Sequence, residues 1–151
     1  MEILYIDLDG VLVDFDKGLV DFYGEHDISD WDFQLNNICK RFPTIFDHLP
    51  EIKNAVKAVK ELSKYYDIYF LSAPIACIPE SYTSKRNWIK NKFGEWADER
   101  LILSHRKDLL KGKFLIDDSL RFGVPDFEGE HIHFGKDKFP DWKTITNYLI
   151  N

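Results

Sequence analysis

The sequence has few cysteines and no excess of positive charge. Its 151 residues include only Cys39 and Cys77, too few for a disulfide scaffold or for a zinc site of clustered thiolates. Acidic residues outnumber basic ones by 26 to 20, which gives a formal net charge of −6. Binding to a nucleic-acid polymer through a basic surface is therefore not expected. The scarcity of cysteine is typical of a reducing compartment and predicts a cytoplasmic protein.

Long apolar segments are missing as well. No apolar run approaches the roughly 20 residues that a membrane-spanning helix requires. The N-terminal residues do not show the basic segment, apolar segment and small-residue cleavage site of a secretion signal. Repeats, low-complexity tracts and dividing linkers are also absent from the sequence. With 44% hydrophobic and 30% charged residues, the chain is expected to form a single globular domain, residues 1–151, without a membrane partner.

The sequence does contain short apolar segments that alternate with segments of helical periodicity. Five apolar segments are predicted as strands: Ile3–Ile6, Ile68–Leu71, Leu101–Leu103, Phe114–Ile116 and His131–Phe134. Helices are expected over about residues 51–65, over about residues 83–93 with Gly94 as the stop, and at the end of the chain. This alternation predicts an α/β fold with a mainly parallel sheet.

The segment from about residue 14 to residue 49 does not follow this alternation. It is rich in aromatic residues, namely Phe15, Phe22, Tyr23, Trp31, Phe33, Phe42 and Phe46. We predict a small, mostly helical cap that is inserted directly after the first strand. Most of these rings are expected to form the core of the cap.

The first strand ends in two carboxylates, within the stretch YIDLDGVLVD. If the extended backbone continues, Asp7 and Asp9 point to the same side. Two such charges repel each other unless a cation lies between them or one carboxyl keeps its proton. Gly10 then allows the chain to turn at once. The stretch therefore indicates that a positive group is bound there.

Further polar residues follow the other strands. Ser72 comes after the second strand, and the pair Asp117 and Asp118 comes after the fourth. A single aspartate in a loop means little, but two acidic pairs at one edge of a parallel sheet favour a site for Mg²⁺ and a phosphate. Lys85, near the predicted start of the second helix, adds a cation that would reach a phosphate oxygen, although a lone lysine is more often a surface residue.

The order of these motifs resembles that of a known superfamily. DLDGV, FLSAP, Lys85 within SKRNWIKNKFG, and LIDDS follow the four motifs of the haloacid dehalogenase-like (HAD) phosphohydrolases. With LPEIKNAVKAVKEL, ILSHRK, HIHF and FPDWKTI, the chain is similar to the 5′(3′)-deoxyribonucleotidases over nearly its whole length, except across the insertion. The resemblance implies a three-layer HAD-like Rossmannoid fold and a Mg²⁺-dependent phosphomonoesterase that acts on deoxyribonucleoside monophosphates.

The same resemblance implies a role for each acidic residue. Asp7 would be the nucleophile that forms an aspartyl-phosphate, and Asp9 would be the general acid/base. Asp9 would also offer its backbone carbonyl to the metal. Asp117 or Asp118 would complete the Mg²⁺ site, and these two possibilities stay open.

The resemblance also implies phosphate and substrate contacts. Ser72, the amide of Ala73 and Lys85 would hold the phosphate, and Phe15 would line the nucleoside pocket. Ser72 and Ala73 stand where the better-known members carry Thr and Ser, and Ser119 stands where they carry Arg. These departures affect the expected substrate preference more than the hydrolysis.

Two alternatives to the nucleotidase hypothesis are a HAD phosphatase for another small phosphomonoester and a phospho-accepting module like a response-regulator receiver. A receiver has its acidic pair after the first strand and a lone acceptor aspartate after the third, which this sequence does not reproduce. Among the histidines, His131 and His133 are interpreted as structural rather than as ligands. His105 is left open as a phosphate or substrate contact.

Overall fold

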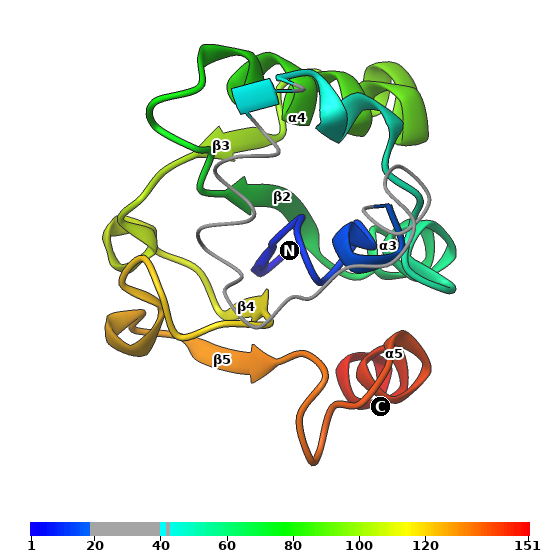
Figure 1. Ribbon diagram of the computed structural model, residues 1–151. Coiled ribbons are helices and arrows are strands. Elements are labelled where there is room, and N and C mark those ends of the chain that lie inside the picture. Colours follow the sequence, from blue (N-terminus) through cyan, green and yellow to red (C-terminus); the bar gives the residue numbers. More distant parts are fainter. Residues whose placement is uncertain (19–39, 42) are drawn as a thin grey trace.

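A parallel β-sheet forms the centre of the molecule (Figure 1). The structure is a computed structural model that describes residues 1–18, 40–41 and 43–151. Within these residues the sheet has the order β3-β2-β1-β4-β5, and all neighbouring strands are parallel. The strands are β1 (Ile3–Ile6), β2 (Asp67–Ser72), β3 (Leu101–Leu103), β4 (Phe114–Asp117) and β5 (Glu130–His133). The predicted α/β fold is confirmed, and each predicted strand lies within one residue of its observed bounds.

The helices cover one face of this sheet. They are α3 (Ala55–Leu62), α4 (Pro79–Phe93) and α5 (Trp142–Ile150). Leu4 and Ile6 of β1 point toward this side, where they join the core formed with the three helices. No helix in the described part of the chain is long and apolar enough to span a bilayer.

The opposite face of the sheet has a thinner cover. Tyr5 packs there with Leu115, Val124 and Phe127. The chain on this side consists of loops with the short 3₁₀ helices η3 (Lys107–Leu109) and η4 (Val124–Asp126). The connections from β3 to β4 and from β4 to β5 are short, so the third layer of the predicted fold is made of turns rather than α-helices.

Two helices begin at other residues than predicted. α3 begins at Ala55 instead of about residue 51, because Asn54 before it has a left-handed backbone (φ 66°) and ends the irregular segment there. α4 begins at Pro79 instead of about residue 83, since proline suits the first helical position. Its stop at Gly94 (φ 68°) is confirmed. As a consequence, Lys85 lies well inside α4 rather than at its start.

Only the ends of the predicted cap belong to the described residues. Residues 15–18 are helical, and Ile45–His48 form the 3₁₀ helix η1. The rings of Phe15 and Phe46 pack against each other with their centroids 5.4 Å apart. Residues 19–39 and 42, with most of the aromatic residues of the predicted cap, lie outside the described residues, so the cap stays a prediction.

The turn after β1 is fastened to the helical layer by a buried tryptophan. The indole N–H of Trp142 donates a hydrogen bond of 2.8 Å to the carbonyl of Val11. Both residues are buried, so this carbonyl cannot turn to water if the indole is removed. The bond thereby fixes the segment that follows Asp7 and Asp9.

Replacement of Trp142 by Phe tests this bond. We expect Trp142→Phe to lower the free energy of unfolding by about 1–3 kcal/mol, because the buried carbonyl loses its donor. Trp96→Phe is the matched control, since Trp96 is 41% exposed and its change should stay within about 0.5 kcal/mol. Urea denaturation curves of the two variants measure the difference. Equal stability of both variants would contradict the proposed contribution of the bond.

Candidate active site

The carboxyl ends of the central strands open onto a cavity of about 1110 Å³. Asp7 follows β1, Ser72 ends β2, and Asp118 follows β4, and all three line this cavity together with Lys107. They come together because β1 pairs with β2 on one side and with β4 on the other. The ends of parallel strands, where the connections diverge, are the usual ligand site of an α/β sheet.

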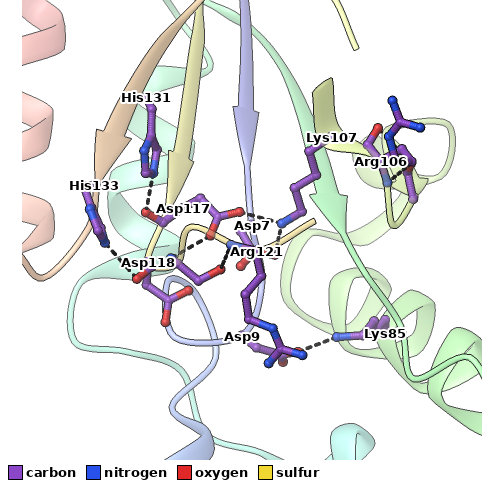
Figure 2. A network of polar contacts seen from close by, with 12 residues as sticks. Asp7, Asp9, Lys85, Arg106, Lys107, Asp117, Asp118, Arg121, His131 and His133 are labelled. Atoms are coloured by element: carbon purple, nitrogen blue, oxygen red, sulfur yellow. Dashed lines mark hydrogen bonds and ion pairs between the residues drawn. The ribbon is translucent and has the colours of Figure 1, made fainter. Parts of the chain in front are cut away.

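Three of the four predicted metal-binding aspartates bring their carboxylates together. The oxygen atoms of Asp7, Asp117 and Asp118 lie within 4.8 Å of one another. The carboxylate of Asp9 instead lies 2.6 Å from the amine of Lys85 (Figure 2). Asp7 and Asp9 nevertheless line the same cavity, although β1 ends at Ile6, so the expectation that they point to the same side stays a prediction.

A buried lysine occupies the centre of the cluster. Lys107 is 2% exposed, and its Nζ atom lies 3.0 Å from Oδ1 of Asp7 and 2.6 Å from Oδ2 of Asp117. Burial alone would lower the pKa of Lys107, but the two carboxylates outweigh it, so the pKa is raised. In the sequence, Lys107 stands out only as the last residue of the motif ILSHRK. The available signal was its place shortly after β3, at the same edge of the sheet.

Among the described residues, the cluster contains three carboxyl groups and a single lysine, so the ammonium group cannot neutralise all three carboxylates. Burial raises the pKa of Asp7 to about 8, although Lys107 acts in the opposite direction and the neighbouring aspartates add to the increase. Burial and the charge of Asp117 also raise the pKa of Asp118 to about 6. Like charges in a buried site disfavour full ionisation unless a cation is present. Several carboxylate oxygens at this spacing fit a hard cation such as Mg²⁺.

The two adjacent aspartates at the end of β4 have different surroundings. Asp117 uses one oxygen for Lys107 and the other to accept the backbone N–H of Ser119 at 2.9 Å. Asp118 lines the cavity. Gly10 lies against Asp118, since a Cβ atom on Gly10 would come within 2.0 Å of Oδ2 of Asp118. The positive φ of 76° at Gly10 agrees with the predicted turn, and the close approach is a second reason for glycine.

Of the three residues predicted to contact the phosphate, Ser72 and Ala73 line the cavity, whereas Lys85 is engaged in an ion pair. Ser72 is 1% exposed and lines the cavity, and its hydroxyl oxygen has no hydrogen-bond partner within the described part of the chain. Ala73 lines the cavity beside it. Lys85 is also 1% exposed, but it is paired with Asp9 and lies with its amine 4.6 Å from the centroid of the Phe46 ring. In this structure the lysine that lines the cavity is Lys107.

The histidines hold the backbone around the site. The Nε2 atoms of His131 and His133 lie 3.0 Å from the carbonyl oxygens of Asp117 and Asp118, respectively (Figure 2). Since a carbonyl can only accept, each Nε2 carries the hydrogen. Their rings stack with centroids 4.9 Å apart. This geometry agrees with a structural role, in which both side chains position the acidic turn.

His105 and Phe15 both line the cavity. The Nε2 atom of His105 lies 2.6 Å from the carbonyl of Pro74, so this imidazole holds the loop after β2. Phe15 is 6% exposed, and its ring packs against that of Phe46.

Comparison with known proteins identifies first the class and then the family. A haloacid dehalogenase-like family hydrolase from Xanthomonas campestris superimposes with a TM-score of 0.55 at 11% identity, covering 99% of this chain and 91% of that one. At this identity the likeness shows the fold alone, which is HAD-like. Residues 1–143 match the family described as 5′ nucleotidase, deoxy (Pyrimidine), cytosolic type C protein. The chain belongs to this nucleotidase family and is thus a phosphoric monoester hydrolase.

Two relatives agree with this membership. A protein of Vibrio phage KVP40 is 43% identical over 150 residues, which cover 99% of this chain and 85% of the relative. A protein of Staphylococcus aureus strain Mu50 is 27% identical and covers 84% of this chain and 74% of the relative. Both carry the name "Putative 5'(3')-deoxyribonucleotidase". The predicted resemblance to this family is confirmed.

The raised pKa values of Asp7 and Asp118 make the stability of the metal-free protein depend on pH. The stabilisation from each carboxyl is complete below its ordinary pKa of 3.8 and is lost as the pH rises toward the folded values of about 8 and about 6. In EDTA we expect the urea midpoint to fall between pH 5 and pH 8. Asp7→Asn has no proton to lose at this position and should show a shallower fall. Parallel pH profiles for the two proteins would contradict the raised pKa of Asp7.

Proposed function

We propose that the protein is a Mg²⁺-dependent nucleotidase that hydrolyses deoxyribonucleoside monophosphates through an aspartyl-phosphate on Asp7. The observation that carries the proposal is the cluster of three carboxylates, two of them paired with the buried Lys107, beside a cavity of about 1110 Å³. Membership of the nucleotidase family and the names of both relatives support a nucleoside monophosphate as the substrate. The proposal includes a cytoplasmic location and a soluble small molecule as the substrate.

The cluster has the donors that a magnesium ion takes. Asp7 and Asp118 would contribute carboxylate oxygens that face the cavity, and Asp9 would contribute its backbone carbonyl. Asp117 would act through Lys107 and through the Ser119 amide, because both of its oxygens are engaged. The ion would neutralise charge between Asp7 and the phosphate, so that two anions can approach each other.

Asp7 and Asp9 would divide the chemistry between them. The Asp7 carboxylate attacks phosphorus, and the bond between phosphorus and the nucleoside oxygen breaks. Asp9 gives its proton to the leaving alkoxide and, in the second step, takes a proton from the water that cleaves the aspartyl-phosphate. Phosphate is released and both carboxyl groups return to their starting state.

The cations and donors of the site would hold the phosphate. Lys107 stabilises negative charge on the phosphoryl oxygens, and the Ser72 hydroxyl and Ala73 amide donate hydrogen bonds to them. In the structure Lys85 is paired with Asp9. Transfer of its amine to a phosphate oxygen would release Asp9 for the proton transfer.

An inserted cap over residues from about 14 to 49 is part of the same proposal. Its two ends lie side by side, since the Asp14 N–H donates to the carbonyl of Pro50 and the Ile52 N–H donates to that of Leu12, both at 2.8 Å. A segment that leaves and re-enters the fold at one place is well suited to cover the cavity and to exclude water. Phe15 lies at the first of these ends and would contact the nucleoside.

The first test of this function is a phosphate-release screen. It compares nucleoside 5′-, 3′- and 2′-monophosphates with ribose phosphate and glycerol phosphate, in Mg²⁺ and in EDTA. We expect deoxyribonucleoside monophosphates to be the best substrates, with activity that disappears in EDTA and returns with Mg²⁺. Asp7→Asn should lose essentially all turnover while it stays folded, and Asp137→Asn, at an exposed loop residue, is the matched control.

Two outcomes of this screen would contradict the proposal. Turnover by folded Asp7→Asn would exclude the aspartyl-phosphate. Sugar phosphates that equal or exceed every nucleotide would retain the phosphatase chemistry and point to another small phosphomonoester as the substrate.

A second test separates Asp9 from Asp7. Asp9→Asn keeps the shape of the side chain but can neither donate nor take the proton. We expect it to slow hydrolysis of a nucleoside monophosphate by about 10²–10⁴-fold and hydrolysis of p-nitrophenyl phosphate much less, because nitrophenolate leaves without protonation. Steady-state kinetics on both esters measure this difference. Equal losses on the two esters would exclude Asp9 as the acid.

A further inference from the structure

One aromatic residue in the cavity differs from the others in exposure. Several of the rings that line the cavity belong to the packed core, since Phe15, Phe46 and Phe134 are 6%, 3% and 8% exposed. Phe122 lines the same cavity and is only partly buried. Of the phenylalanines that line it within the described residues, Phe122 is therefore the most exposed, and the guanidinium of Arg121 lies over one side of its ring, 4.9 Å from the centroid.

The backbone of Phe122 is in an unfavourable conformation. Its φ of 57° lies in the left-handed region, which bulky side chains rarely adopt and which glycine or asparagine would adopt more easily. The conformation is held in place, because the backbone N–H of Lys107 donates a 2.8 Å hydrogen bond to the Phe122 carbonyl. Unfavourable backbone that is held in this way is concentrated at functional sites.

The Phe122 ring is connected through His105 to the loop after β2, which carries the predicted phosphate contacts. The imidazole of His105 contacts it edge-on, with the ring centroids 5.7 Å apart. The same imidazole is hydrogen-bonded to Pro74, two residues after Ser72. Only the length of the Lys107 side chain separates the Phe122 carbonyl from the carboxylate of Asp7. Because Phe122 and Asp7 also line the same cavity, a group attached to a phosphate at Asp7 would come within reach of this ring.

We propose that Phe122, supported by His105, is a substrate-contacting residue on which the base of a nucleoside monophosphate stacks. The proposal rests on the proposed nucleotidase function and adds to it a specificity-determining ring from the core fold, outside the cap. A base offers a flat face to an aromatic side chain. Aliphatic phosphates have no such face, so the contact selects for phosphate esters that carry a flat aromatic group.

The test separates the ring from the backbone that carries it. Phe122→Asn removes the ring but tolerates the left-handed conformation, and Phe122→Tyr keeps the ring. Leu120→Asn is the matched control, because Leu120 lies in the same loop and is 61% exposed. Each variant is assayed with thymidine 5′-monophosphate, p-nitrophenyl phosphate and acetyl phosphate at saturating Mg²⁺. Binding of thymidine 5′-monophosphate is also measured by calorimetry in the Asp7→Asn background.

For Phe122→Asn we expect KM and the dissociation constant for thymidine 5′-monophosphate to rise by about 5- to 150-fold, the range for losing one stacked ring. Its kcat should change little, and its kinetics on acetyl phosphate should match those of the wild type. Phe122→Tyr and Leu120→Asn should stay close to the wild type on every substrate. A Phe122→Asn variant with unchanged affinity for the nucleotide, or with equal losses on acetyl phosphate, would overturn the proposal.

Failure of the nucleotidase function would be recognised separately. If the wild type cleaves p-nitrophenyl phosphate and acetyl phosphate but no nucleoside monophosphate, the proposed function is wrong. The aryl ester then decides the role of Phe122. A rise in KM for p-nitrophenyl phosphate alone supports the ring contact, and equal changes on the aryl and the aliphatic ester overturn it.

Discussion

The ammonium group of Lys107 is the contact on which the site depends. It holds the carboxylates of Asp7, which follows β1, and of Asp117, which ends β4, at 3.0 and 2.6 Å, and all three side chains are buried or nearly so. Without this cation the parallel pairing of β1 and β4 would bring two buried negative charges together. Removing one partner from such a buried group typically costs about 3–5 kcal/mol. The sheet order and the lysine are therefore parts of one arrangement.

The same lysine connects the charged centre with the wall of the cavity. Its side chain reaches Asp7, and its backbone N–H holds the carbonyl of Phe122. Lys107 begins the turn η3, and a Cβ atom on Gly123 would come within 2.1 Å of Oδ1 of Asp108 in this turn. The connections that follow β3 and β4 are thus locked together. This explains how the short turns on the thin face of the sheet can form one wall of the cavity without an α-helix.

The sequence predicted those features that local patterns determine. The strands and the convergence of Asp7 with the acidic pair of β4 follow from apolar periodicity and from the edge rule for parallel sheets. The contacts of Lys107 with Asp7 and Asp117 could not be predicted from apolar periodicity. They depend on how the connection after β3 folds back over the end of β1. The ion pair between Asp9 and Lys85 depends on where β1 ends and where α4 begins. Sequence patterns predict the ends of strands and helices only to within a few residues. The left-handed backbone of Phe122 leaves no mark in the sequence, since phenylalanine disfavours it.

The hydrogen bonds around the acidic turn, residues 117–118, explain why the carboxylates of the cluster stay close together in spite of their repulsion. The carbonyls of Asp117 and Asp118 accept from His131 and His133, and the Asp117 carbonyl also accepts the N–H of Phe134. With its backbone fastened to β5, the turn cannot relieve the crowded carboxylates by moving away. Relief must then come from a proton, which the raised pKa of Asp7 reflects, or from a bound cation. We infer that this fastening preserves the repulsion between the carboxylates, so that part of the binding energy of a cation comes from the removal of that repulsion.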